Sequence, residues 1–239
     1  MRLDEAIVNR GLLDSRNKAK EQIKKSKVKV NGKLITKPSY KVGLEDKIEI
    51  LENNVYVSRA AWKLKNYLEK YNIDFKEKTV LDVGSSTGGF SEVSLEKGAK
   101  KVVCVDVGSN QLHPKIKNHS KVESYENTDI RDFDYPEKFD IVVSDVSFIS
   151  LLKVIKKIDE LAKSDIILLF KPQFEVGKDV KRDKKGVVTD TEAVKKAREN
   201  FEKETRKLGW KLKRSEESSV KGKEGNIEYI YHFVKEYND

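Results

Sequence analysis

The chain has 239 residues, of which 37% are hydrophobic and 37% charged, with a formal net charge of +9 and a mean hydropathy of −0.66. This length allows one large or two smaller domains with a hydrophobic core, and no apolar run approaches the roughly 18 residues of a membrane span. A single cysteine, Cys104, excludes an intrachain disulfide and a multi-thiolate site, and three scattered histidines argue against a histidine site, so we predict no metal.

The first residues and the distribution of charge indicate where the protein works and what it binds. The N-terminal sequence MRLDEAIVNRG has acids where a signal peptide has its apolar core, so we expect a cytoplasmic protein without a membrane partner. Residues 1–60 contain 14 Lys and Arg against 8 Asp and Glu, and residues 15–41 contain ten basic residues and one acid. The segment 15–41 is therefore predicted to contact a polyanion.

The first fifty residues predict two short helices and a small sheet. Residues 3–9 show an apolar helical pattern closed by Gly11, and Ser15 is placed to cap a second helix that extends to about Lys25. Residues 28–30 alternate and run into Asn31-Gly32, which is a hairpin signal, and residues 47–51 predict a closing strand.

These elements, in this order, resemble the S4-type RNA-binding domain of ribosomal proteins and RNA-modifying enzymes. The similarity covers the stretches RLDEAIVNRGLLDSRNKAKEQI, VKVNGKLITKPSYKV and DKIEI. One departure is Ser26, where that domain often has glycine, and it concerns only the local turn. The resemblance implies a helix face and a hairpin that grip phosphates and RNA shape rather than a long sequence. The residues expected to contact RNA are Arg16, Lys18, Lys20, Lys24, Lys25, Lys29, Lys33 and Arg59.

The rest of the chain predicts an α/β domain. We expect the S4-type domain at 1–52, a linker at 53–58 and the second domain at 59–239, which opens with a helix to about Tyr71. Strands are then predicted at 79–83, 101–105, 121–125, 139–144 and 165–170, and helices at 89–97, 110–117, 150–162 and 190–207. Such alternation requires a mostly parallel sheet covered on both faces. Two final strands, 210–217 and 227–234, predict an antiparallel hairpin at the sheet edge, as in the Rossmann-like class I methyltransferases.

The stretch TVLDVGSSTGGF, residues 79–90, predicts a ligand-binding turn between a strand and a helix, although a plain turn explains it too. It lacks the full GxGxxG of a dinucleotide site. The acid before the first glycine resembles motif I of S-adenosylmethionine-dependent methyltransferases, with Ser85 where alanine is common. This resemblance implies S-adenosylmethionine as the cofactor. Its contacts are expected from Asp82, Gly84, Ser85, Ser86, Gly88, Gly89 and Phe90.

Acids lie at the ends of four predicted strands, where ligands bind in an open α/β sheet. They are Asp82, Asp106, Asp129 and Asp145. The position of Asp106 suits a carboxylate that accepts both ribose hydroxyls of an adenosine, and Asp129 is placed to reach the adenine. A capping or turn role explains each acid singly as well as ligand contact does. Their coincidence favours a ligand site.

The residues after the fourth and fifth strands of the domain restrict the chemistry. Methylating an alcohol calls for a base and for positioning, because an alcohol is a weak nucleophile. Base N-methylases commonly carry Asn-Pro-Pro-Tyr where this chain has SDVSF, and cytosine C5 enzymes need a nucleophilic cysteine in this region. The candidate catalytic residues that remain in this region are Asp145 and Lys171. A desolvated lysine can lose its proton and act as a base toward a ribose hydroxyl.

At this point the sequence resembles the TlyA family of rRNA ribose 2′-O-methyltransferases, some labelled haemolysins, which join an S4-type module to an FtsJ-like domain. The matching stretches are SRAAWKL, the motif I loop, SDVSF, KPQFE and GNIEY, and the resemblance spans essentially the whole chain. It implies ribosomal RNA or ribosomal subunits as the partner, transfer to cytidine, and a catalytic tetrad. Matched to this sequence, the tetrad is Lys63, Asp145, Lys171 as general base, and Glu228.

Other interpretations stay open. The charged, glycine-punctuated segment 175–190 is either a solvated loop or a mobile flap over RNA. The protein as a whole could instead be a non-catalytic RNA-binding or ribosome-binding factor. A haemolysin-type membrane activity and a small-molecule O-methyltransferase are further alternatives, of which the latter leaves the basic first 60 residues unexplained.

Overall fold

The structure is a computed structural model that describes residues 1–51 and 56–236. The chain divides into two compact units, Met1–Val55 and Tyr56–Asp239. Residues 53–55 of the predicted linker lie outside the described residues, whereas the Tyr56 side chain is buried in the core of the second unit.

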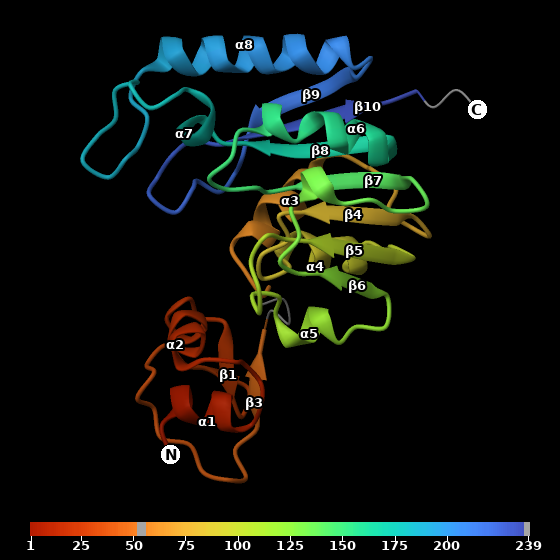
Figure 1. Ribbon diagram of the computed structural model, residues 1–239. Helices are drawn as coiled ribbons and strands as arrows, with labels where there is room; N and C mark the ends of the chain where they lie inside the picture. The colour runs from red at the N-terminus through yellow and green to blue at the C-terminus, as the bar shows by residue number, and fades with distance from the viewer. Residues whose placement is uncertain (52–55, 237–239) are drawn as a thin grey trace. The chain divides into compact units, whose positions relative to one another are not determined.

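The first unit packs two helices against a small antiparallel sheet (Figure 1). The helices are α1 (Leu3–Asn9) and α2 (Arg16–Lys24), and the strands, in sheet order, are β2 (Lys33–Leu34), β1 (Val28–Val30) and β3 (Ile48–Ile50). Ser15 caps α2 as predicted, because its side chain accepts a hydrogen bond from the Lys18 amide. The core contains Leu3, Ala6, Ile7, Leu13, Ala19, Ile23, Val28, Val30 and Val42.

Two turns of this unit explain residues noted in the sequence. Asn31 and Gly32 take φ values of 49° and 77°, so both adopt the left-handed conformation that a two-residue hairpin requires. Ser26 also has a positive φ, 58°, which explains why glycine suits this position in S4-type domains.

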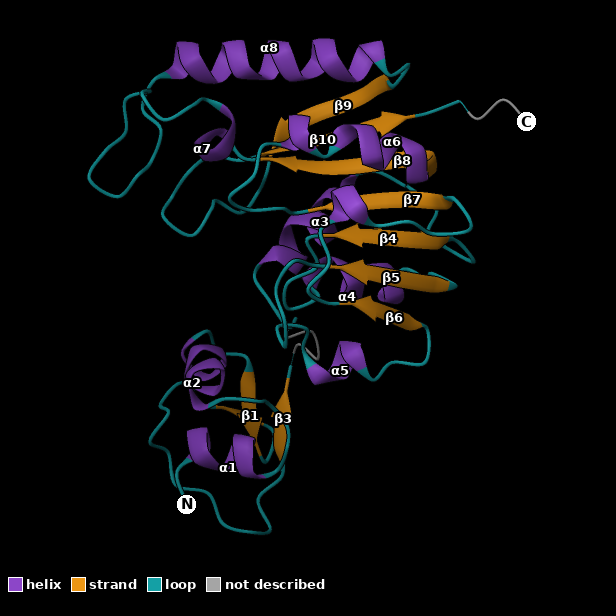
Figure 2. Cartoon of the chain, viewed as in Figure 1, coloured by secondary structure: helices purple, strands orange, loops and turns teal. Residues whose placement is uncertain are grey.

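The second unit is built on a seven-stranded sheet in the order β6-β5-β4-β7-β8-β10-β9 (Figure 2). The first five strands of this unit are parallel: β4 (Thr79–Val83), β5 (Lys101–Val105), β6 (Val122–Tyr125), β7 (Phe139–Ser144) and β8 (Ala162–Phe170). The predicted hairpin is present as β9 (Lys211–Glu217) and β10 (Tyr229–Val234), and β10 lies antiparallel between β8 and β9. The α/β fold expected from the sequence is therefore confirmed.

Both faces of this sheet are buried, because alternate residues of each strand enter two different cores. On β8, Ile166, Leu168 and Phe170 pack into one core, while Ile167 and Leu169 pack into the other. The first core is covered by α6 (Ile155–Leu161) and α8 (Thr191–Lys207), and the second by α3 (Ala60–Lys70), α4 (Gly89–Glu96) and α5 (Pro114–Lys117). The strand order reverses between β4 and β7, which is where such sheets bind ligands.

Several element boundaries differ from the prediction. The helix expected at 110–117 is the single turn α5, because Pro114 occupies its first turn and His113 caps it. The helix expected at 150–162 consists of the 3₁₀ turn η2 (Leu151–Lys153) followed by α6, and β8 begins directly after α6 at Ala162. Another 3₁₀ turn, η1 (Ile130–Asp132), and the short helix α7 (Pro172–Glu175) were not predicted.

Candidate active site

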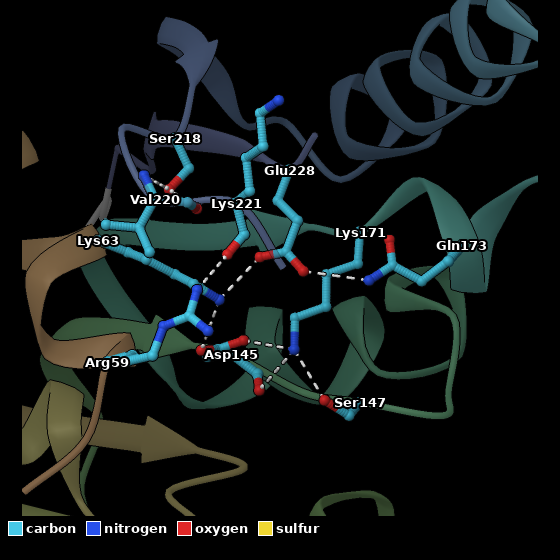
Figure 3. Close-up of polar contacts among 10 residues, drawn as sticks. All are labelled: Arg59, Lys63, Asp145, Ser147, Lys171, Gln173, Ser218, Val220, Lys221 and Glu228. Atoms are coloured by element: carbon cyan, nitrogen blue, oxygen red, sulfur yellow. Dashed lines mark hydrogen bonds and ion pairs between the residues drawn. The ribbon is translucent and has the colours of Figure 1, made fainter. Parts of the chain in front are cut away.

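Four charged side chains from distant parts of the chain meet beside the carboxyl ends of β7 and β8 (Figure 3). Lys63 comes from α3, Asp145 follows the last residue of β7, Lys171 follows the last residue of β8, and Glu228 precedes β10. The carboxyl ends of the parallel strands therefore bring together the four residues that the family resemblance implied.

The four groups form a chain of ion pairs. Lys171 Nζ lies 2.5 Å from Asp145 Oδ1, Lys63 Nζ lies 3.5 Å from Asp145 Oδ2, and Lys63 Nζ lies 2.7 Å from Glu228 Oε2. Between 2% and 12% of each side chain is exposed. Two amines thus face two carboxylates, so the formal charge of the group is balanced away from bulk water, where an unpaired charge is costly.

Neighbouring groups complete the hydrogen bonding around this tetrad. The Lys171 amine donates to Ser147 Oγ at 2.8 Å, and the Gln173 amide donates to Glu228 Oε1 at 3.1 Å. The Arg59 guanidinium donates to the Lys221 carbonyl at 3.1 Å (Figure 3). Ser147 and Gln173 were not assigned a role from the sequence, although both lie in stretches that carried the family resemblance.

Two cavities open beside the tetrad at the ends of β4, β5 and β7. The smaller cavity, about 140 Å³, is lined by Ser58, Ala60, Asp82, Gly84, Ser85, Ser86, Thr87, Gly89, Phe90, Asp145, Ser147 and Lys171. The larger cavity, about 430 Å³, shares Gly84, Ser86, Asp145 and Ser147 with it and extends past Asp106 and Asp129 between apolar walls that include Val107 and Ile130. Every predicted cofactor residue except Gly88 lines one of these cavities.

The Asp82 carboxyl is the least solvated polar group of the smaller cavity. Only 1% of Asp82 is exposed; Oδ2 accepts a hydrogen bond from the Ser91 hydroxyl at 2.6 Å, and Oδ1 has no partner among the described residues. The pKa of Asp82 is raised to about 7. Burial is the main cause, the charges of Asp145 and Asp106 add to it, and the Ser91 hydrogen bond opposes it with a smaller effect. A cationic group that enters this cavity would therefore find an unsatisfied carboxyl oxygen.

The acids of the larger cavity are fixed in two different ways. Both carboxylate oxygens of Asp106 accept backbone amide hydrogen bonds of 2.7 Å, from Ser86 and Gly108. Asp129 caps η1 and forms a 2.6 Å ion pair with Arg131, and this hydrogen-bonded guanidinium holds the pKa of Asp129 below its usual range. Asp129 thus has a capping role in addition to its place in the cavity wall.

The glycines of the motif I loop serve packing as well as ligand access. Gly84 has φ +74°, and a Cβ there would lie 2.9 Å from the Val146 side chain. At Gly89 a Cβ would lie 2.2 Å from Ser58 Oγ and 2.8 Å from the Ala61 amide, so this glycine allows α3 to approach α4 closely. Both glycines are therefore required by close packing around the loop as well as by the turn itself.

Comparisons with known proteins agree with this arrangement. A family model for FtsJ-like methyltransferases matches residues 56–235, and one for the S4 domain matches residues 1–48. The 23S rRNA (cytidine-2′-O)-methyltransferase TlyA of Campylobacter jejuni is 48% identical over 98% of this chain and 100% of its own length. Hemolysin A of Brachyspira hyodysenteriae is 39% identical over 98% of this chain and 100% of its own length.

The chain belongs to the TlyA family of FtsJ-like methyltransferases. A solved structure of a hemolysin-named protein from Streptococcus thermophilus is similar to this chain, with a TM-score of 0.72 and 30% sequence identity. The similarity covers 99% of this chain and 88% of the other. The protein is accordingly an S-adenosylmethionine-dependent methyltransferase with an S4 domain.

The residues of this TlyA-family site fit S-adenosylmethionine. The unpartnered Oδ1 of Asp82 suits the ammonium of the amino-acid end, and the paired amides that orient Asp106 leave its carboxylate available to hydroxyl groups. The apolar walls of the larger cavity suit a flat aromatic base. When bound, this cofactor supplies a methyl group on a sulfonium.

The basic residues expected to contact RNA differ in how they are used within this TlyA-family chain. Arg16 pairs with Asp4 at 3.2 Å and with Glu5 at 3.1 Å, Lys18 pairs with Asp14, and Lys25 pairs with Glu21. Lys24 and Lys33 are exposed and form no ion pair with a described residue. These two lysines are therefore available to a phosphate.

The segment 175–190 contains its own network of hydrogen bonds. The Arg182 guanidinium donates to the carbonyls of Gln173, Gly177, Lys178 and Val180, and Asp183 accepts from the amides of Lys185 and Val187. Arg182 thus holds the loop together, whereas Lys181, Lys184 and Lys185 are exposed. The flap hypothesis remains a prediction, with Arg182 in a structural position.

No helix in residues 1–51 and 56–236 combines the length and the apolar character needed to cross a bilayer. Within the same residues, no group of three or more His, Cys, Asp or Glu side chains could hold a metal ion.

Proposed function

We propose that the protein transfers a methyl group from S-adenosylmethionine to a ribose 2′-hydroxyl of cytidine in ribosomal RNA, with Lys171 as the general base. The observation that carries this proposal is the Lys171 amine, which lines the smaller cavity and lies 2.5 Å from Asp145 Oδ1. The name of the C. jejuni relative supports ribosomal RNA and cytidine as the acceptor.

The tetrad residues have distinct parts in this proposal. A neutral Lys171 amine accepts the hydroxyl proton as the oxygen attacks, and Asp145 stabilises the ammonium that forms. The Ser147 hydroxyl and the Asp145 carboxylate fix the direction of the amine. Lys63 lies against the other oxygen of Asp145, Glu228 pairs with Lys63, and in this proposal both residues place the ribose.

The N-terminal unit supplies RNA affinity in this proposal. The S4 domain would hold phosphates of the RNA through Lys20, Lys24, Lys29 and Lys33, and Arg59 would contact RNA beside the tetrad. We assign the domains as 1–52 and 59–239 with a linker at 53–58. We propose a cytoplasmic location, because ribosomal RNA would be the substrate.

Mapping of 2′-O-methyl marks tests the proposal directly. Ribosomal RNA from cells that contain the protein should carry a 2′-O-methyl mark on a cytidine, and RNA from cells without the protein should lack it. Purified ribosomal subunits incubated with the protein and tritiated S-adenosylmethionine should gain a labelled methyl group on cytidine. If no ribose gains a methyl group in either experiment, the proposed acceptor is wrong.

A membrane activity is the second candidate, and the name of the B. hyodysenteriae relative favours it. Release of dye from liposomes on addition of the purified protein measures this activity. Leakage that persists in a Lys171→Ala variant would assign it to a part of the protein other than the tetrad.

A further inference from the structure

Glu175 connects two segments that meet at the tetrad. It ends α7, the single turn that begins directly after Lys171 (Figure 1). Its Oε2 accepts a hydrogen bond from the Ser150 hydroxyl at 2.6 Å, and its Oε1 accepts one from the Leu151 amide at 2.8 Å. Both carboxyl oxygens are therefore used by the segment 145–151, which follows β7.

The segment 145–151 carries groups that hold the Lys171 amine. Asp145 Oδ1 lies 2.5 Å from Lys171 Nζ, and Ser147 Oγ accepts a hydrogen bond from this amine at 2.8 Å (Figure 3). Asp145 comes directly after β7, whereas Ser147 lies farther from the strand and depends on the rest of the segment. Contacts that fix the far end of the segment therefore help to place the Ser147 hydroxyl.

Phe148, next to Ser147, has a backbone conformation that its own side chain disfavours. Its φ is 64°, in the left-handed region that bulky residues seldom adopt, and the residue is 91% exposed, so burial does not hold it there. Such a conformation persists only where the surrounding structure imposes it. β7 holds the segment on one side. On the other side are the two hydrogen bonds to Glu175 and the Phe174 ring, whose centre lies 5.2 Å from that of Phe148.

The Glu175 carboxyl group is partly buried without a cation. It forms no ion pair with any residue that the structure describes, and burial raises its pKa above the ordinary value, although the hydrogen bonds from Leu151 and Ser150 lower it. Removing a carboxyl group from water is unfavourable unless its oxygens accept hydrogen bonds. The use that the fold makes of this group is to hold the segment 145–151.

We propose that Glu175 is a positioning residue for methyl transfer, which fixes the turn that holds the Ser147 hydroxyl against the Lys171 amine. Glu175 lines neither cavity beside the tetrad, so it acts through Ser147. The inference rests on the proposed role of Lys171 as the base. A displacement of the base by about 1 Å can lower the rate about 10²-fold, because the amine must face the hydroxyl that it deprotonates.

Two substitutions of Glu175 separate positioning from charge. Glu175→Ala removes both acceptors and should lower the single-turnover rate about 10²-fold at saturating cofactor and RNA. Glu175→Gln keeps an acceptor for the Leu151 amide and a partner for the Ser150 hydroxyl, so its rate should stay within about threefold of the wild type. A normal rate in Glu175→Ala, or an equally low rate in Glu175→Gln, would overturn the proposal.

Asp140 offers a matched control. Its carboxylate also accepts one backbone amide and one hydroxyl hydrogen bond, at 2.9 Å and 3.0 Å, both from Thr79 at the start of β4. Asp140→Ala should lower Tm but leave the single-turnover rate unchanged. An equal loss of rate in Asp140→Ala and Glu175→Ala would mean that Glu175 only stabilises the fold.

A double-mutant cycle tests the route through Ser147. Ser147→Ala should itself slow transfer, and Glu175→Ala/Ser147→Ala should be no slower than the slower single variant. Rate losses that multiply, or a normal rate in Ser147→Ala, would contradict this route.

NMR of protein isotopically labelled at lysine Nζ gives a signature that needs no methyl transfer. The Lys171 resonance, identified by its absence in Lys171→Ala, should shift in Glu175→Ala and in Ser147→Ala and stay in place in Asp140→Ala. An unshifted resonance in Glu175→Ala would overturn the proposal even if the rate falls. A shifted resonance in a protein that methylates no ribose would support the positioning contact and reject only the proposed function.

Discussion

The amine of Lys63 lies 2.7 Å from Glu228 Oε2, although 165 residues separate the two in the chain. Only 2% of the Glu228 side chain is exposed, so its charge depends on that amine and on the Gln173 amide. This pair therefore links folding of the second unit to the arrangement of its active site.

A double-mutant cycle should show strong coupling between these two residues. Lys63→Met leaves a buried carboxylate without its cation, which costs about 3–5 kcal/mol. The double variant Lys63→Met/Glu228→Gln should be destabilised by less than the sum of the single changes. Urea unfolding measures each free energy of unfolding. On the same helix, Lys70→Met removes an exposed ion pair with Glu216 and should destabilise the protein far less than Lys63→Met. Additive energies in the cycle would contradict the coupling.

Replacing the proposed base should separate catalysis from cofactor binding. Lys171→Ala should lower the single-turnover methylation rate by about 10²–10⁴-fold, because a general base contributes on that scale. Calorimetry should find S-adenosylmethionine affinity within about threefold of the wild type. Lys156→Ala, an exposed lysine of α6, is the control. Near-normal turnover by Lys171→Ala would mean that another group takes the proton.

Asp82 should make stability and cofactor affinity depend on pH in opposite directions. The pKa of Asp82 is about 7 in the folded protein, above the ordinary value of 3.8. Between these two pH values the folded state holds a proton that the unfolded state has lost, so the contribution of Asp82 to the free energy of unfolding falls as pH rises. Asp82→Asn should thus raise Tm at pH 8 relative to the wild type and leave it nearly unchanged near pH 4.

Cofactor binding to Asp82 should follow the charged form. Wild-type affinity for S-adenosylmethionine should rise as pH increases through about 7, and Asp82→Asn should remove this dependence and bind more weakly. Asp179→Asn, an exposed acid, should behave as the wild type in both experiments. A cofactor affinity that is equal in Asp82→Asn and wild type would exclude Asp82 from the binding site.

The unpaired lysines of the S4 domain should dominate its RNA affinity. Lys24→Gln and Lys33→Gln should each reduce the slope of log affinity against log salt by about 0.7–0.9. Lys25→Gln should change the slope less, because Glu21 already neutralises this ammonium at 2.7 Å. Filter binding to an rRNA fragment across a salt series gives the slopes. Equal slopes for all three variants would show that ion pairing within the domain does not select its RNA contacts.

The loop 175–190 should respond differently to two kinds of change. Reversing the charges of Lys181, Lys184 and Lys185 to Glu should weaken RNA binding if the loop covers RNA, without altering its fold. Arg182→Ala removes four hydrogen bonds to carbonyl groups and should speed amide hydrogen exchange throughout the loop. Unchanged RNA affinity after the triple reversal would reject the flap hypothesis.

The periodic parts of the fold could be predicted from the sequence, because both cores rest on alternation within strands. Boundaries set by tertiary contacts could not. The predicted helix at 150–162 is interrupted because Ser150 caps η2 and Glu175, from a later segment, accepts the Leu151 amide at 2.8 Å. Ala162 enters β8 with no turn residue to mark the change.

The candidate site was predictable to different degrees. Asp82 and Asp145 follow from their positions at strand ends, since the parallel sheet gathers those ends together. Lys63 and Glu228 look like surface charges in isolation, and only the family resemblance assigned them. Ser147 and Gln173 carry no chemical signal of their own, because their roles depend on the groups that the fold places beside them.

The insertion of β10 between β8 and β9 has a consequence for protein synthesis. The residues that line both cavities all precede β10 in the chain, so they leave the ribosome before Glu228 does. Until β10 emerges, one edge of β8 lacks its neighbour and Lys63 lacks its nearer carboxylate. The tetrad proposed to catalyse methyl transfer is therefore the last part of the site that synthesis can complete.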